Sequence, residues 1–144
     1  MATINPYLNF NGNTEEAFNF YKSVFGGEFA TVLRFGEAPG CEAMPEVEKG
    51  KIMHIALPIG NGDVLMGTDV VESSGQKLEV GNNISISVSP ASKEEADRLF
   101  NGLAEDGNVE VPLADAFWGG YFGMLKDRFG IRWMVNYDER FSSN

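Results

Sequence analysis

Two stretches of the chain repeat the same order of strand-like and helix-like segments, and this repeat limits the possible folds more than any other feature. Glu15-Glu16-Ala17 opens an amphipathic segment in the first stretch, and Glu94-Glu95-Ala96 opens another in the second. Each motif follows an alternating apolar-polar segment and precedes three further segments rich in strand-forming residues. Matching helix starts in a matching order of elements indicate an internal duplication. We therefore expect two βαβββ modules.

The repeat gives boundaries for each module within one domain, residues 1–144. The first module spans about residues 4–69, a polar linker about residues 70–82, and the second module about residues 83–137. Asn13 is the expected N-cap of a helix over residues 14–25, and Ser92-Lys93-Glu94-Glu95 is a capping box that opens the second helix. Strands are predicted over residues 4–10, 29–35, 51–59 and 64–69, and over residues 83–89, 109–111, 121–126 and 131–137.

The charge of the chain excludes several classes of partner. Its 11 Lys and Arg against 21 Asp and Glu give a formal net charge of -10. An acidic chain without a basic stripe is repelled by phosphate backbones and by anionic lipid surfaces, so neither nucleic acid nor membrane is expected as a partner. The single Cys41 excludes an internal disulfide framework. The N-terminal residues lack a signal-peptide pattern, and we expect a cytoplasmic protein.

Strand alternation predicts which side chains face a ligand. Two such modules side by side form an α+β fold, an open eight-stranded cup with its helices outside. If Leu8, Met53 and Ile84 and their alternating neighbours pack under the helices, the opposite set lines the cup. That set is Asn5, Tyr7, Asn9, His54, Met66, Asn83, Ser85, Arg132, Met134 and Asn136. Such a polar face suits a hydrogen-bonded small molecule, although antiparallel sheets also commonly leave one face to water.

Several motifs resemble the PhnB-like branch of the vicinal oxygen chelate superfamily. They are Asn5-Pro6-Tyr7-Leu8-Asn9-Phe10-Asn11-Gly12-Asn13, Phe117-Trp118-Gly119-Gly120-Tyr121-Phe122-Gly123, and the segment from Asp127 to Met134. The superfamily includes glyoxalase I, extradiol dioxygenases, and fosfomycin and bleomycin resistance proteins. The resemblance implies a homodimer. Members have been labelled 3-demethylubiquinone 3-methyltransferase, but the sequence shows no glycine-rich S-adenosylmethionine loop.

The resemblance also implies where a divalent metal would bind, through one side chain at each of four inward positions. Those positions fall on Asn5, Met66, Asn83 and Met134. None is His, Glu or Asp, and two amides with two thioethers are poor ligands for Fe(II), Ni(II), Zn(II) or Mn(II). We therefore expect neither the family-type metal nor another cofactor.

Other side chains have both a functional and a structural interpretation. His54 is the single His and a candidate acid, base or metal ligand, or a hydrogen-bonded residue without chemistry. Asp69 lies at a strand end, where it either reaches the cup or serves a turn. Arg132 either clamps an anion or pairs with Asp127 or another acid of the chain. Trp118, Tyr121 and Phe122 form an aromatic wall for a ligand, pack in the core, or make a dimer contact.

Three functions remain open from the sequence. The first is a protein that binds a small molecule in the cup without the usual metal, using the cup-lining residues together with Asp69, Trp118 and Phe122. The second is a metal-dependent lyase, isomerase or related enzyme with displaced ligands such as His54 and Asp69. The third is a structural or regulatory dimer whose cup is vestigial.

Overall fold

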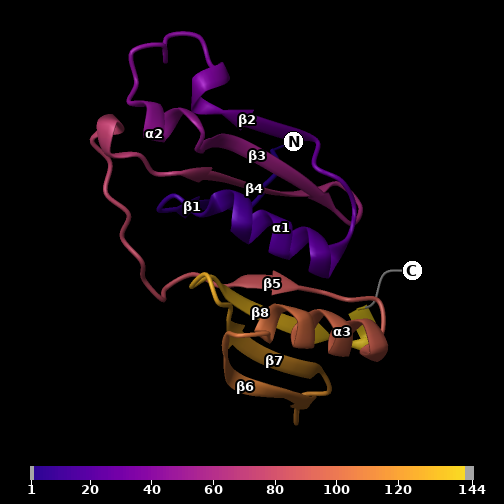
Figure 1. Cartoon of the computed structure of the whole chain (residues 1–144). Coiled ribbons are helices and arrows are strands. Elements are labelled where there is room, and N and C mark those ends of the chain that lie inside the picture. The colour runs from indigo at the N-terminus through magenta and orange to yellow at the C-terminus, as the bar shows by residue number, and fades with distance from the viewer. Residues whose placement is uncertain (1, 142–144) are drawn as a thin grey trace. The chain divides into compact units, whose positions relative to one another are not determined.

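A computed structural model describes residues 2–141, and these divide into two units. Unit 1 runs to Glu79 and unit 2 begins at Val80, so the division falls inside the predicted linker. Each unit contains one four-stranded sheet with a long helix packed against it (Figure 1). Among the described residues, no helix has the length and apolar content needed to cross a membrane.

Unit 1 has the topology βαβββ, with short helical turns added between its strands. Its sheet has the order β1-β4-β3-β2, in which β1 runs parallel to β4 and the other pairs are antiparallel. The elements are β1 (Tyr7–Phe10), α1 (Thr14–Phe25), β2 (Thr31–Arg34), η1 (Phe35–Glu37), α2 (Glu46–Lys49), β3 (Ile52–Ile59), β4 (Asp63–Asp69) and η2 (Glu72–Ser74).

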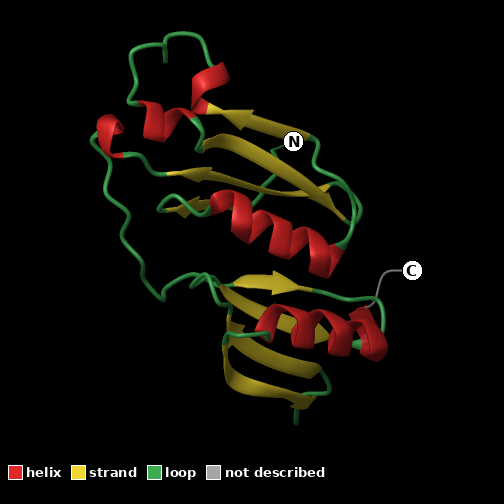
Figure 2. Cartoon of the chain, in the orientation of Figure 1, coloured by secondary structure: helices red, strands yellow, loops and turns green. Residues whose placement is uncertain are grey.

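Unit 2 repeats this topology (Figure 2). Its sheet order is β5-β8-β7-β6, and β5 again runs parallel to the last strand, β8. The elements are β5 (Ile86–Val88), α3 (Lys93–Ala104), β6 (Asn108–Asp115), β7 (Tyr121–Lys126), β8 (Arg132–Tyr137) and η3 (Glu139–Phe141). The matching strand orders confirm the predicted α+β class and its two βαβββ modules.

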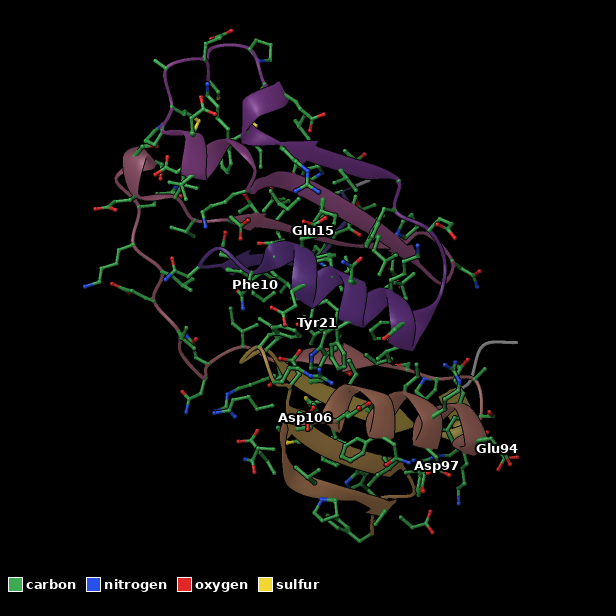
Figure 3. All side chains as sticks on the ribbon, in the orientation of Figure 1. Phe10, Glu15, Tyr21, Glu94, Asp97 and Asp106 are labelled. Atoms are coloured by element: carbon green, nitrogen blue, oxygen red, sulfur yellow. The ribbon has the colours of Figure 1, made fainter. Side chains whose placement is uncertain are left out.

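Each helix buries an apolar stripe against its sheet. Phe18 and Tyr21 of α1 are fully buried, and the Phe18 ring meets Phe10 of β1 edge to face at 6.3 Å (Figure 3 labels Phe10 and Tyr21). Gly67 of β4 lies under that ring, because a Cβ at this position would approach it to 2.6 Å. In unit 2, Trp133 is 1% exposed and packs beneath α3, as its alternation with Arg132 predicts.

The two helices begin in different ways. Ser92 caps α3 as predicted, since its side chain accepts a hydrogen bond from the Glu95 backbone N–H at 3.1 Å. The Asn13 side chain makes no capping hydrogen bond. Asp69 of β4 takes that role instead: its Oδ1 accepts from the backbone N–H groups of Gly12 and Thr14 at 3.1 and 3.0 Å. The N-terminus of α1 is therefore satisfied by a residue from the last strand of unit 1.

Three residues predicted to pack under the helices do not do so. The register of β2 against β3 shifts between Leu33 and Arg34, which leaves Met53 as the extra residue of a bulge. Ile52, at 1% exposed, therefore takes the helix-facing place predicted for Met53, which is 37% exposed. Ile4 and Ile84 precede β1 and β5, and at 96% and 76% exposed neither packs under a helix.

Candidate functional site

The sheet face of unit 1 that points away from α1 carries Tyr7 and His54. We call it the helix-free face of unit 1 and define it by Tyr7, His54, Met66 and Thr68. The Tyr7 hydroxyl lies 3.1 Å from His54 Nδ1, and the two rings stack at 5.7 Å with 27° between their planes. Burial raises the pKa of the Tyr7 phenol, while the Thr68 hydroxyl beside it acts in the opposite direction. Tyr7 is therefore a neutral phenol at neutral pH.

Asp69 lies on the opposite face of the same sheet, which corrects its assignment as a ligand-binding residue. It is 4% exposed, and on β4 it shares the helix-facing side with Leu65 and Gly67. Its carboxylate accepts from the Thr14 hydroxyl at 2.6 Å and from the Ile52 backbone N–H at 2.8 Å, in addition to the two backbone groups at the start of α1. Asp69 is therefore a structural residue, and it cannot share a metal ion with His54 through the sheet.

The other candidates of unit 1 lie at the edge of the helix-free face or on it. Asn5 precedes β1, and its Oδ1 accepts from the Val64 backbone N–H at 3.1 Å, so its side chain fixes the start of the β1–β4 pairing. Asn9 is exposed on β1, and Met66 is half-buried on β4 opposite Tyr7.

Unit 2 carries an aromatic and thioether surface on the sheet face away from α3. We call it the helix-free face of unit 2 and define it by Trp118, Phe122, Met124, Met134 and Asn136. Trp118 meets Phe122 edge to face at 5.9 Å, and Phe122 and Met124 are register partners of Asn136 and Met134. The three strand residues that were predicted to share one face of β8 do so: Arg132, Met134 and Asn136 alternate with the buried Trp133 and Val135.

Asn136 has an unusual environment on this face. Its Oδ1 is buried and has no hydrogen-bond donor among the described residues. The Trp118 ring lies beside it: a Cβ built on Gly120 would stand 1.9 Å from that ring and 2.8 Å from Asn136 Oδ1. Only a glycine at position 120 admits this placement of the indole. A buried acceptor without a donor costs about 1–3 kcal/mol, so it requires a specific explanation.

Arg132 pairs with an acid across the sheet. Its Nη1 donates to both carboxylate oxygens of Glu110 on β6 at 2.6 Å, and the two side chains are 20% and 30% exposed. Sequence reasoning considered pairing with an acid and suggested Asp127, which instead accepts from Trp133 Nε1. Glu110 was missed because it lies at an irregularity of the β6–β7 register, where alternation does not identify the facing side.

The other site residues predicted for unit 2 are not part of this surface. Tyr121 is not part of the aromatic group, because it lies on the α3 side and its hydroxyl donates to Asp97 at 2.6 Å (Figure 3 labels Asp97). That hydrogen bond raises the pKa of Tyr121. Asn83 precedes β5 and is exposed, which corrects its assignment to a strand, and Ser85 is half-buried just before β5.

Substituting Gly120 tests the placement of Trp118. We expect Gly120→Ala to force the indole off the sheet, lowering the free energy of unfolding by about 1–3 kcal/mol. Trp118 and Trp133 are the two tryptophans of the chain, and Trp133 is buried. Acrylamide quenching of tryptophan emission should therefore increase in the variant. Gly81→Ala is the control, since a Cβ there meets only Asn83 Oδ1 at 3.8 Å. Unchanged quenching in Gly120→Ala would contradict this placement.

Comparison with known families covers nearly the whole chain. A family described as 3-demethylubiquinone-9 3-methyltransferase matches residues 2–136. The chain belongs to this family. This PhnB-like chain is 44% identical to protein PA1353 from Pseudomonas aeruginosa, with a TM-score of 0.84 over 96% of this chain and 98% of the other.

Two further solved structures resemble the chain. The putative 3-demethylubiquinone-9 3-methyltransferase, PhnB protein, from Bacillus cereus is 30% identical, with a TM-score of 0.73 over 94% of this chain and 99% of the other. A glyoxalase/bleomycin resistance protein/dioxygenase family enzyme from Burkholderia phytofirmans is 14% identical, with a TM-score of 0.58 over 91% of this chain and 95% of the other. The last likeness, at 14% identity, concerns the fold alone.

Proposed function

We propose that this PhnB-like protein binds a small planar molecule on the helix-free face of unit 2, without the metal of its superfamily. The observation that carries the proposal is the buried Asn136 Oδ1, an acceptor with no donor among residues 2–141. A ligand with an N–H or O–H group supplies the missing donor, and its ring takes the place of the indole that now lies beside this oxygen.

The surroundings of Asn136 fit an aromatic ligand. Trp118 is 40% exposed and Phe122, Met124 and Met134 are half-buried, so the patch is covered incompletely. Aromatic edges and polarisable thioethers make favourable contacts with a ring, and methionine adapts to different shapes. Because the Trp118 ring lies beside Asn136 Oδ1, binding includes a rotation of the Trp118 side chain. Arg132 lies on the same strand face, but Glu110 already neutralises its charge.

We infer binding without a metal from the side chains at the four positions where the family would hold one. Asn5 Oδ1 is engaged by the Val64 N–H, Asn83 lies outside β5, and the other two donors are thioethers. These groups do not fit a divalent metal that prefers imidazole or carboxylate. Within the described part of the chain, no three His, Cys, Asp or Glu side chains gather into a possible metal site. The proposal concerns binding and assigns no methyl-transfer step.

A matched pair of fluorinated probes tests the proposal by ¹⁹F NMR. 4-Fluorophenol carries the O–H donor, whereas 4-fluoroanisole has the same ring without it. We expect 4-fluorophenol to bind more tightly than 4-fluoroanisole by about 5- to 10-fold, the value of one hydrogen bond of about 1 kcal/mol. Asn136→Leu should remove this preference while retaining the binding of 4-fluoroanisole, and excess EDTA should change neither affinity.

Asn9→Leu, an exposed substitution in unit 1, serves as the control and should retain the preference. Equal affinity of the two probes for the unaltered protein would overturn the role of Asn136. Absence of binding of both probes would favour a vestigial surface. Loss of binding with EDTA would favour the metal-dependent alternative.

A further inference from the structure

We propose that Asn61 is a site of spontaneous covalent modification, at which the side-chain amide is lost and part of the product carries isoaspartate in the main chain. The reaction needs no enzyme, and it does not depend on the function proposed for Asn136. Asn61 lies between Gly60 and Gly62 in the turn that joins β3 to β4. The dipeptide Asn-Gly occurs at three places in the chain, and the fold blocks the reaction at the other two.

The chemistry is the closure of a five-membered ring. The backbone nitrogen of Gly62 attacks Cγ of Asn61, so that an N–Cγ bond forms and the Cγ–Nδ2 bond breaks. The side-chain nitrogen leaves as ammonia, taking the proton of the Gly62 N–H. Water then opens the cyclic imide at one of its two carbonyl carbons, which gives either aspartate or isoaspartate. Both products carry a carboxylate in place of the neutral amide.

The turn between β3 and β4 leaves room for this ring. Asn61 and Gly62 are exposed, and a Cβ built on Gly60 or Gly62 would meet no atom within 4 Å. The Gly62 N–H, which must lose its proton for the attack, makes no hydrogen bond to another described residue. Because Gly62 has no side chain, no Cβ crowds the attacking nitrogen. The nucleophile and the amide are therefore both accessible in the folded protein.

At the dipeptide Asn11-Gly12 the fold engages the nucleophile. The Gly12 N–H donates to Oδ1 of Asp69 at 3.1 Å, and Asp69 is 4% exposed. Attack by this nitrogen requires the hydrogen bond to a charged group to break, and negative charge then develops on the nitrogen beside a carboxylate. We expect the reaction here to be slower than at Asn61 by about tenfold or more.

The third dipeptide, Asn101-Gly102, lies inside α3. Each N–H of a helix bonds to the carbonyl four residues earlier, so the Gly102 nitrogen is engaged as well. Ring closure turns this nitrogen toward Cγ of Asn101 and breaks that helical turn. Every other asparagine that has a successor precedes a residue with a side chain, which crowds the attacking nitrogen. Asn61 is therefore the asparagine that the fold leaves reactive.

Peptide mapping with trypsin tests the proposal on the full chain. Cleavage after Lys and Arg places Asn11, Asn61 and Asn101 in separate peptides, residues 1–22, 52–77 and 99–126, and Asn61 is the only asparagine of its peptide. Replacement of the amide by a carboxyl group adds about 1 Da. During incubation of the folded protein at mildly alkaline pH, we expect peptide 52–77 to gain this mass about tenfold or more faster than the other two. Chromatography should separate its product into aspartyl and isoaspartyl forms.

Two controls separate the effect of the fold from that of the local sequence. In concentrated urea the contact with Asp69 and the helix α3 are lost, so the three peptides should gain mass at similar rates. Asn61→Gln would have to close a six-membered ring, and its peptide 52–77 should stay without the added mass over the same incubation. Similar rates for the three peptides in the folded protein, or an unchanged difference between them in urea, would overturn the proposal.

Discussion

Asp69→Ala is expected to lower the free energy of unfolding by about 3–5 kcal/mol, because three backbone N–H groups lose their acceptor and each costs about 1–3 kcal/mol when buried and unpaired. These groups belong to Gly12, Thr14 and Ile52, so the substitution loosens both the start of α1 and the start of β3. Urea unfolding followed by far-UV circular dichroism measures the loss.

Two matched variants define the origin of this effect. Asp69→Asn retains an oxygen that can replace Oδ1 but places an NH₂ group against the Ile52 N–H, and an intermediate loss is expected. Asp63→Ala changes an exposed carboxylate at the other end of β4 and should cost about 0.5 kcal/mol or less. If Asp69→Ala is no more destabilising than Asp63→Ala, then the carboxylate does not hold α1 to the sheet.

The second large effect is expected at Asp127, which organises the β7–β8 hairpin. Its Oδ1 accepts from the backbone N–H groups of Phe129 and Ile131 at 2.8 and 3.0 Å, and its Oδ2 accepts from Trp133 Nε1 at 2.8 Å. Asp127→Ala leaves these donors without that acceptor, and we expect a loss of about 2–4 kcal/mol. Emission from Trp133 should also change, since the indole N–H lies in a buried site and loses its partner.

Asp115→Ala is the matched control in unit 2. Asp115 is exposed and pairs with Lys93 at 3.0 Å, a type of ion pair worth about 0–1 kcal/mol. A Trp133→Phe background separates the two contributions of Asp127, because it removes the side-chain donor and keeps the backbone donors. If Asp127→Ala were equally costly with and without Trp133, the indole hydrogen bond would contribute nothing to stability.

Local pattern was sufficient to predict much of the fold. The helix predicted over residues 14–25 has those bounds, since its apolar spacing and the glycine pair that ends it are both local signals. The strand predicted over residues 121–126 also has those bounds. The repeated order of elements identified the two modules because each repeat carries its own helix and strands.

The errors arose where a distant partner decides the structure. Asp69 acts on residues 55 positions earlier in the chain, and no local pattern reveals that contact. Because of the bulge at Met53, Ile52 is buried and Met53 is exposed, which is the reverse of the prediction. Ile84 continues an alternating pattern, but pairing with β8 begins only at Ile86. Alternation therefore predicts the sheet face of a side chain only for residues that pair with a neighbouring strand.

The candidate site was predicted in part for the same reason. Tyr7, His54, Met134 and Asn136 follow from period-two alternation along regular strands. Trp118 lies in the segment before β7, and its position depends on the missing side chain of Gly120, which sequence alone does not connect to Asn136. The tyrosine and histidine were both predicted to face one side, but their hydrogen bond also depends on the registers of β1 with β4 and of β4 with β3, which alternation along one strand does not predict.

The parallel pairing of β1 with β4 affects how unit 1 emerges during synthesis on the ribosome. The strand made first has the strand made last as its only neighbour in the sheet, and the carboxylate that caps α1 ends that last strand. A nascent chain that stops before β4 therefore lacks both the sheet partner of β1 and the cap of α1. Cooperative closure of unit 1 therefore requires Asp69 to have left the exit tunnel. In unit 2 the first strand, β5, likewise depends on the last strand, β8, whereas α3 is capped by its local residue Ser92.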